Sequence, residues 1–514
     1  MDNINFISLS DEFKETIKTN FDKKLDIFNV QLFNPIYVKY EKFDDPSDIL
    51  KSKYFIKNIN EASDNIDNDD NVSYVKTFVK AEVINQFNNT FHNYELFCKQ
   101  VPIIDPIEEL LQDKKDNYEF RLANIYNNNI VSKINNFQNA AYIDAFFTYI
   151  GSKMTETGKC PCFPVFFGTF SGVKRNYLFD LTEDFSDIKG NNNFQENLAK
   201  KYCELKFKKC EVDLVDIDDF EDDENLEILD NIEFDNIDLD DMITETIDID
   251  SDEEKDSKIK GLIKIDDNFR FDDIISKNTD TIKYIQFPEM PVQIIFLEKL
   301  YCTLEEYVQK ECMDVSPEEW KSILFQICFG LAVAQKRYNL VHNDLHCDNI
   351  MFQKTNIDYL YYNYEDQYFK IPTFGKIVKI IDFGRATFIH NKIIYFSDQF
   401  DQDGDAEGQY DYPENNSYRG CKVKPNFSFD LARLTSTIIH YFDFDSDIYK
   451  LLKSWITDKN NYFLMNDPDD FDLYKNIARN VKNAVPKKQI KKSIFKLFSI
   501  DKLKIPKKSF VYNY

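Results

Sequence analysis

A long apolar helix followed by a dense polar loop constrains the fold of this chain most strongly. Residues 320–339, WKSILFQICFGLAVAQKRYN, place apolar side chains at i, i+3, i+4 and i+7, which predicts a buried helix. Ser316 and Pro317 supply its start, as N-cap and first helical residue. The chain then reads LVHNDLHCDNI over 340–350 and KIVKIIDFGRA over 376–386. Both stretches place polar residues beside strand-like apolar runs, as a functional loop would.

Charge is distributed very unevenly along the 514 residues. The net charge of −27 argues against binding of nucleic acid by the molecule as a whole, because a phosphate backbone would be repelled. Roughly two dozen acidic residues and almost no basic ones fall within 211–256. Such a composition buries too little apolar surface to fold, so we predict an acidic, disordered insertion over 211–258. The basic tail, 486–514, is expected to be a solvated face, although it could also contact an anionic surface.

The remaining patterns predict an α+β fold with two lobes. Residues 36–40, 165–170 and 291–300 have the apolar density of strands, whereas 140–154 and 431–442 are spaced as helices. Strand-rich sequence therefore precedes helix-rich sequence. The predicted parts are a divergent N-terminal lobe (1–210), the acidic insertion (211–258), the end of that lobe with a hinge (259–300), a helical lobe (301–485) and the basic tail (486–514).

Cysteine usage and hydropathy bear on the compartment. The ten cysteines have no regular spacing, and no second pair or histidine cluster completes a zinc set with Cys160 and Cys162. No window reaches about eighteen consecutive apolar residues, and the first residues do not resemble a signal peptide. We therefore expect a soluble, cytoplasmic protein with reduced thiols.

The spacing of polar residues fits phosphoryl transfer. That reaction needs metal ligands on the phosphates, a carboxylate near the acceptor hydroxyl and a cation on the α- and β-phosphates. His342-x-Asp344-x4-Asn349, followed by Asp382-Phe383-Gly384, supplies the first two. The order and surroundings of these motifs resemble the protein-kinase superfamily, whose catalytic loop reads H-x-D-L-x-x-x-N before D-F-G.

The resemblance implies a role for each residue. Asp344 would orient the attacking hydroxyl, and Asn349 and Asp382 would hold Mg²⁺ on the phosphates of ATP. Structural roles are implied for His342, Phe383 and Gly384, and for Asp430, which would tie down the backbone of the catalytic loop. Glu298, in IIFLEKL, resembles the hinge segment that receives adenine.

The nucleotide-binding lobe departs from the kinase pattern. No glycine precedes Gly151, so the glycine-rich phosphate loop is absent. We predict Lys39 as the lysine that contacts the phosphates, because it ends the strand-like run NPIYVK; the alternatives are Lys42, Lys76 and Lys80. Its acidic partner could be Glu82 or Asp144. The interval from Asn349 to Asp382 is also about twenty residues longer than usual, and should extend a strand hairpin.

His346 bears on the substrate. A lysine is common two residues after the catalytic aspartate, but an imidazole can also donate a hydrogen bond to phosphate, so we include His346 among the catalytic residues. Small-molecule phosphotransferases of the aminoglycoside and choline type, and haspin-like protein kinases, also carry Asp-Leu-His. The whole motif set resembles the divergent Ser/Thr protein kinases of poxviruses and giant viruses. That resemblance implies phosphorylation of proteins, including virion proteins, in the host cytoplasm or the virion. A small-molecule phosphotransferase and a pseudokinase scaffold remain the alternatives.

Overall fold

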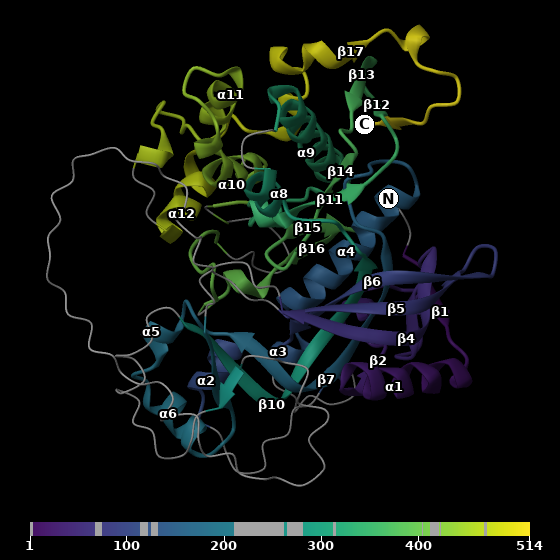
Figure 1. Ribbon diagram of the computed structural model, residues 1–514, viewed down its shortest axis with the longest axis vertical. Helices are drawn as coiled ribbons and strands as arrows, with labels where there is room; N and C mark the ends of the chain where they lie inside the picture. Colours follow the sequence, from purple (N-terminus) through teal and green to yellow (C-terminus); the bar gives the residue numbers. More distant parts are fainter. Residues whose placement is uncertain are drawn as a thin grey trace, which may run out of the picture. The chain divides into compact units, whose positions relative to one another are not determined.

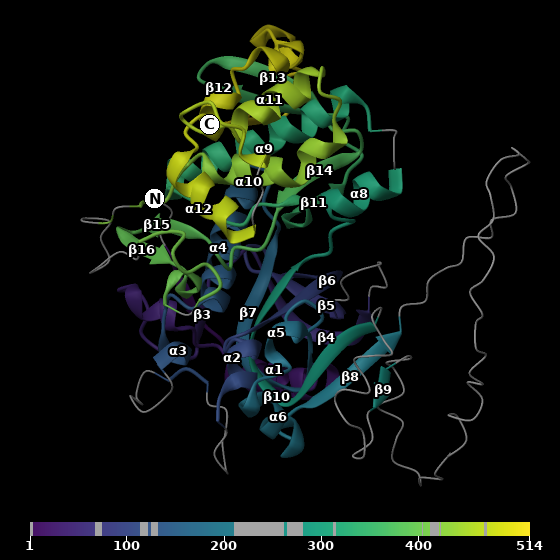
Figure 2. The same cartoon turned by 90° about the vertical axis from the view of Figure 1, so that its left-hand side faces the viewer.

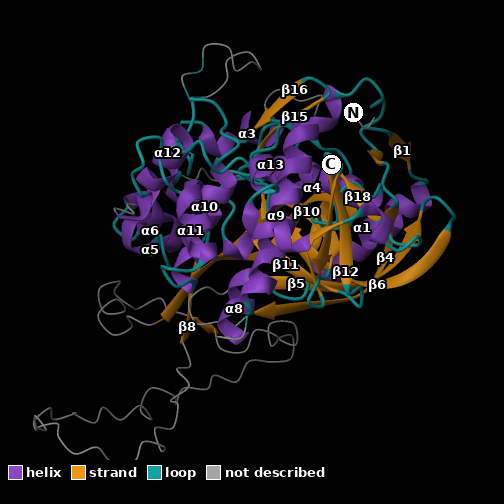
Figure 3. Cartoon of the chain, turned by 90° about the horizontal axis from the view of Figure 1, so that it is seen from above, coloured by secondary structure: helices purple, strands orange, loops and turns teal. Residues whose placement is uncertain are grey.

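The structure is a computed structural model, and its described residues fall into two compact units. It describes residues 4–66, 75–113, 122–124, 132–209, 262–264, 281–311, 315–402, 404–411, 421, 423–466 and 470–514. Unit 1 comprises Met1–Asn65, Val75–Tyr177 and Phe287–Tyr514, and unit 2 comprises Ile66–Tyr74 and Leu178–Gln286. The predicted acidic insertion, 211–258, lies outside the described residues. Helices and sheets are both abundant (Figure 3), which confirms the α+β class.

Unit 1 contains a large sheet with the strand order β2-β7-β10-β6-β5-β4. The strands are β2 (Ile27–Gln31), β4 (Tyr54–Ile66), β5 (Val75–Asn85), β6 (Thr90–Pro102), β7 (Phe166–Asp180) and β10 (Thr281–Glu298). Figure 1 shows β4, β5 and β6 side by side. β6 runs antiparallel to both β5 and β10, with Leu297 opposite Phe97. The predicted strands at 165–170 and 291–300 fall almost entirely within β7 and β10. In β10 the run Val292–Leu297 is apolar apart from one glutamine, and its residues are buried, as expected for a central strand covered on both faces.

Unit 2 is smaller. It contains β8 (Glu204–Lys209), β9 (Leu262–Lys264) and the short helices α5 (Phe185–Ile188) and α6 (Asn192–Ala199). β8 pairs antiparallel with β9 and with the first residues of β10, Thr281 to Gln286.

Helix α4 (Ala140–Glu156) confirms the helix predicted at 140–154 and is buried on almost every side. Its N-cap is Asn139, whose side-chain oxygen accepts a hydrogen bond from the backbone N–H of Ala141 (3.0 Å). A helix this apolar on all sides must lie inside the core rather than on its surface.

The helical part of unit 1 begins after β10. Its α-helices are α8 (Leu304–Glu311), α9 (Pro317–Tyr338), α10 (Phe429–Ile438), α11 (Asp447–Trp455), α12 (Asp470–Asn480) and α13 (Pro486–Gln489). Ser316 caps α9 as predicted, accepting a hydrogen bond from the N–H of Glu319 (3.2 Å). The helix predicted at 431–442 is α10, which continues into a 3₁₀ turn. Figure 2 shows α9, α10 and α11 in the same part of the unit.

Two smaller sheets are formed by strands that follow the polar loop in the chain. β11 (Ile350–Lys354) pairs antiparallel with β14 (Lys376–Ile380). We had expected the residues between them to extend this hairpin, but they do not. They form β12 (Tyr359–Tyr364) and β13 (Gln367–Pro372), which join β17 (Ser499–Ile500) and β18 (Val511–Asn513) in a sheet of order β17-β13-β12-β18. The basic tail thus supplies two strands of this sheet.

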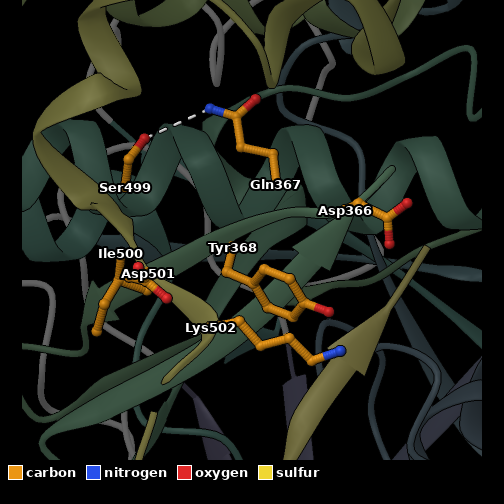
Figure 4. A pocket seen from close by; sticks show the side chains of 7 residues that line it. All are labelled: Asp366, Gln367, Tyr368, Ser499, Ile500, Asp501 and Lys502. Atoms are coloured by element: carbon orange, nitrogen blue, oxygen red, sulfur yellow. Dashed lines mark hydrogen bonds between the residues drawn. The ribbon is translucent and has the colours of Figure 1, made fainter. Parts of the chain in front are cut away.

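Where β13 meets β17, the surface has an open hollow of about 680 Å³ (Figure 4). There the Gln367 amide donates a hydrogen bond to the Ser499 hydroxyl (3.4 Å).

The strand predicted at 36–40 is wrong. Residues Pro35–Lys39 form a 3₁₀ helix, because the Asn34 side chain accepts a hydrogen bond from the Ile36 N–H (2.9 Å) and Pro35 favours the first helical position. The other elements up to α3 are β1 (Phe6–Ser8), α1 (Asp11–Leu25), β3 (Asp48–Leu50), α2 (Pro106–Leu111) and α3 (Ser132–Asn135). Among the described residues, no helix has the length and apolar character needed to cross a membrane.

Candidate active site

The polar loop between α9 and β11 is held by a buried carboxylate from α10. Asp430 accepts hydrogen bonds from the backbone N–H groups of His342 (3.1 Å) and Asn343 (3.0 Å). Burial raises the pKa of Asp430 to about 7, although the two N–H donors act in the opposite direction. Asp430 thus lies where the sequence predicted it, and it fixes the backbone immediately before Asp344.

His342 is buried, and its two neighbours define its protonation. Its Nε2 lies 2.8 Å from the carbonyl oxygen of Ile381, which can only accept, and its Nδ1 lies 3.3 Å from the N–H of Asp344, which can only donate. The ring is therefore neutral with its proton on Nε2, consistent with burial lowering its pKa. It also packs against the Phe383 ring, with the centroids 5.2 Å apart.

The Asp344 carboxylate has two polar neighbours. The Tyr474 hydroxyl, from α12, donates to its Oδ1 (2.9 Å), and the Arg385 guanidinium lies 3.8 Å from its Oδ2. These two contacts fix the position of the carboxylate next to the loop.

Asn349 and His346 contact each other. The Asn349 Nδ2 donates to the backbone carbonyl of Asp344 (2.8 Å) and also lies 2.9 Å from His346 Nε2. Since an amide nitrogen only donates, Nε2 must carry a lone pair and the proton of a neutral ring must be on Nδ1. That Nδ1 lies 3.4 Å from an oxygen of Asp348. The Asn349 amide is thereby oriented, with its nitrogen toward the loop and its oxygen on the other side.

Asp382 lies directly beside this loop. The N–H of the preceding residue, Ile381, donates to the carbonyl of Asn349 (3.1 Å). The Asp382 backbone has φ of 62°, in the left-handed region that aspartate tolerates better than most side chains. The N–H of Gly384 reaches the Asp382 Oδ1 at 3.4 Å. Two sequence-distant motifs are therefore adjacent in space.

Lys99, on β6, forms ion pairs with two carboxylates at once. Its ammonium nitrogen lies 2.7 Å from Asp144 Oδ2 and 2.9 Å from Asp382 Oδ2. Desolvation opposes the charge of Lys99, but the two aspartates outweigh it and raise the lysine's pKa. Desolvation likewise opposes ionisation of Asp382, yet the charge of Lys99 and its hydrogen bond lower the pKa of Asp382 to about 2. Asp382 is therefore ionised at neutral pH.

Lys99, and not the predicted Lys39, is the lysine that lies beside Asp382. Lys39 ends the 3₁₀ helix rather than a strand, and its ammonium group lies over the Phe137 ring, 4.0 Å from the centroid. Two of the alternatives are paired elsewhere, Lys76 with Glu306 and Lys80 with Glu61. None of the predicted lysines was Lys99.

Asp144 is the buried partner of Lys99, one of the two acids named from the sequence. The other, Glu82, pairs with Lys57. Besides Lys99, Asp144 accepts a hydrogen bond from the N–H of Phe383 (2.9 Å). On the same helix, Phe147 packs on the Phe383 ring, with centroids 4.6 Å apart. Helix α4 is thus tied both to the charge and to the packing at Asp382.

Glu298 ends β10, but its side chain serves a structural contact. Its carboxylate lies 2.8 Å from the ammonium of the buried Lys379 and accepts a hydrogen bond from the N–H of Val165 (2.9 Å). Its own backbone N–H donates to the Val165 carbonyl (3.0 Å). The Glu298 side chain is paired with Lys379. It therefore gives no support to the expectation that this segment receives adenine.

The segment after Gly384 folds back on the loop and on α4. It forms the hairpin β15 (Thr387–His390) and β16 (Ile393–Phe396). Further on, the Tyr410 hydroxyl donates to Asn343 Oδ1 (2.8 Å), and Asp398 accepts a hydrogen bond from the N–H of Ala140 at the start of α4 (2.9 Å). Burial raises the pKa of Asp398 to about 7.

The ligand chemistry at Asn349 and Asp382 fits Mg²⁺. An ionised carboxylate and an amide oxygen are hard oxygen donors, which this ion prefers. Asp382 is exposed enough to be reached from solvent, and Lys99 keeps it charged. The β4–β5 connection, residues 67–74, lies outside the described residues.

Comparison with known proteins identifies the same region. Residues 298–421 match the family model described as Haspin like kinase domain. The chain is 38% identical over 101 residues to a probable serine/threonine-protein kinase of Dictyostelium discoideum, covering 18% of this chain and 8% of that protein. It is 33% identical over 135 residues to the serine/threonine-protein kinase haspin of Bos taurus, covering 24% and 17%. It is 34% identical over 89 residues to the uncharacterized protein 098R of Invertebrate iridescent virus 6, covering 16% and 14%. The matches thus span 8% to 17% of the length of these relatives.

Proposed function

We propose that the chain is a protein kinase that uses ATP and Mg²⁺ to phosphorylate Ser/Thr hydroxyls of proteins. The observation that carries the proposal is Lys99, which joins Asp144 on α4 to Asp382 beside the catalytic loop, at 2.7 Å and 2.9 Å. A cation, a metal-binding carboxylate and a proton-accepting carboxylate within one site are the parts that phosphoryl transfer requires. The similarity of residues 298–421 to a haspin-like kinase domain supports the same activity.

Each residue would have a separate role in phosphoryl transfer. Asp344 would accept a hydrogen bond from the attacking hydroxyl and orient it, while Tyr474 holds the carboxylate in place. Lys99 would contact the phosphates of ATP. Asp382 and Asn349 would hold Mg²⁺, which neutralises developing negative charge on the phosphates.

We further propose a viral origin and a division into lobes. Similarity to a protein of an iridescent virus supports a kinase from a large DNA virus, acting in the host cytoplasm or the virion on proteins that include virion components. We retain the predicted boundaries, with the nucleotide-binding lobe at 1–210 and 259–300, the catalytic lobe at 301–485 and a tail at 486–514.

The test is transfer of labelled phosphate from ATP in the presence of Mg²⁺. The acceptors are a generic protein such as casein and, separately, small aminoalcohols and sugars. Label in protein that is lost in Asp344→Asn and Asp382→Asn supports the proposal. Label confined to small molecules would favour a small-molecule phosphotransferase, and no transfer at all would favour a scaffold.

A further inference from the structure

Three consecutive side chains in the catalytic loop gather their ligand atoms at one point. One ligand atom each from His346, Cys347 and Asp348 lies within 4.8 Å of the others. His346 Nδ1 is 3.4 Å from Asp348 Oδ2, and Cys347 Sγ is 3.8 Å from the same oxygen. Asp348 is exposed and so provides access from solvent, whereas Cys347 is buried.

Two of the three separations between these atoms match those of a tetrahedral zinc-type site. With metal–ligand bonds of about 2.0–2.3 Å, the ligands of a tetrahedral zinc ion lie roughly 3.3–3.8 Å apart. The separations from Asp348 Oδ2 to His346 Nδ1 (3.4 Å) and to Cys347 Sγ (3.8 Å) fall within that range, and the third pair of ligand atoms lies within 4.8 Å. An imidazole, a thiolate and a carboxylate together favour Zn²⁺ or Co²⁺ over Mg²⁺, which prefers oxygen ligands alone.

Glu305, from α8, offers a fourth ligand. Its Oε1 accepts hydrogen bonds from the Tyr441 hydroxyl (2.8 Å) and the Gln309 amide (3.0 Å). Its carboxylate also forms a side-chain hydrogen bond with the Cys347 thiol. Burial raises the pKa of the Cys347 thiol and the Glu305 carboxylate adds to that shift, which indicates that Glu305 lies near the sulfur. A carboxylate that is hydrogen-bonded to the Cys347 thiol lies close enough to the sulfur to serve as a further ligand once the thiol proton is released.

We propose that His346, Cys347 and Asp348, with Glu305 as a fourth ligand, bind a zinc-type divalent ion, and that this ion inhibits the adjacent active site. The bonds formed are from the metal to Nδ1, Sγ and the carboxylate oxygens. Cys347 releases its thiol proton to solvent, and the proton on His346 Nδ1 is replaced by one on Nε2.

The inhibition follows from the hydrogen bond between His346 and Asn349. In the structure His346 Nε2 accepts from Asn349 Nδ2 at 2.9 Å. A metal on Nδ1 requires the proton on Nε2, so two donors would face each other. The Asn349 amide then has to rotate and turn its oxygen toward His346, losing its bond to the Asp344 carbonyl. That oxygen is the atom proposed to bind Mg²⁺.

Metal binding is tested first, by titrating the full chain with Co²⁺ and recording its absorption spectrum. A thiolate–cobalt charge-transfer band in the near ultraviolet is expected at one equivalent. Cys347→Ser should remove the band, and Asp348→Asn, at an exposed position, should weaken cobalt affinity by at least about tenfold. Cys421→Ser is the matched control and should leave the band unchanged. Absence of the band from the wild-type chain, or its persistence in Cys347→Ser, would overturn the site.

The inhibitory coupling rests on the proposed function and is tested separately. Zn²⁺ is added at fixed excess Mg²⁺, and binding of a fluorescent ATP analogue is measured alongside phosphate transfer. Zn²⁺ should weaken both in the wild type but not in Cys347→Ser, which controls for chelation of zinc by the nucleotide. Equal loss in both proteins, or no loss, would refute the coupling even if the cobalt band is present. Failure of the kinase proposal would show instead as absent transfer without zinc, while the cobalt band and the zinc effect on analogue binding still decide this inference.

Discussion

Replacing Lys99 tests how the active site is held together. In Lys99→Met the buried Asp144 loses its cation, which lies 2.7 Å away. Removing one partner of a buried ion pair costs roughly 3–5 kcal/mol of unfolding free energy. The hydrogen bond from the Phe383 N–H to Asp144 remains (2.9 Å), and Lys99 itself is partly exposed. We therefore expect the lower end of that range, about 3 kcal/mol.

A second substitution separates charge from packing. Asp144→Asn keeps an oxygen that can accept the Phe383 N–H but removes the unpaired charge. The double variant Lys99→Met/Asp144→Asn should therefore recover most of the lost stability, while phosphoryl transfer stays at least about a hundredfold below wild type, because no cation reaches the phosphates. Lys39→Met is the matched control, since Lys39 lies over the Phe137 ring, and it should retain wild-type transfer.

The measurements are urea unfolding followed by tryptophan fluorescence, and transfer of labelled phosphate. The reasoning would be refuted if Lys99→Met were as stable as the wild type, or if the double variant were no more stable than Lys99→Met. It would also be refuted if Lys39→Met abolished transfer while Lys99→Met retained it.

Three further substitutions test single contacts. Tyr474→Phe removes the 2.9 Å hydrogen bond to Asp344 and should lower kcat roughly threefold to tenfold with little change in KM, measured by steady-state kinetics. Lys379→Met leaves the Glu298 carboxylate without its cation and should cost roughly 3 kcal/mol in urea unfolding, which Glu298→Gln in the same chain should largely restore. Burial raises the pKa of Asp398 from 3.8 to about 7, so its contribution to stability is complete below pH 3.8 and lost as pH rises through 7. Relative to Asp398→Asn, the wild type should therefore lose up to about 1.4 kcal/mol per pH unit between pH 4 and 7, and parallel stability curves would contradict this.

The residues of the candidate site that belong to local sequence motifs could be named from the sequence, whereas the residue that depends on tertiary pairing could not. Asp344 and Asn349 are separated by a fixed local spacing and Asp382 begins a local triplet, so these motifs pointed to the three residues, whose roles stay predictions. Lys99 lies on β6, which is paired on one side with β5 and on the other with β10, a strand about two hundred residues later in the chain. The periodicity of the sequence does not show which lysine of such a sheet faces Asp382. One signal was present: LFCK at 96–99 is an apolar run that ends in lysine, whereas the run before Lys39 begins with a helix-starting Asn-Pro.

The long interval between Asn349 and Asp382 does not disturb the site, because the β11–β14 ladder fixes both ends. Ile350 pairs with Ile380, so the residues just outside this pair, Asn349 and Ile381, must be adjacent whatever the length of the connection. Lengthening a surface loop costs little free energy, since its closure entropy grows only logarithmically with length. The added residues also bury apolar side chains of their own, because β12 and β13 pair with strands of the C-terminal tail. The geometry at the proposed metal ligands therefore depends on the register of two strands rather than on sequence distance, and an insertion of this size is compatible with the proposed active site.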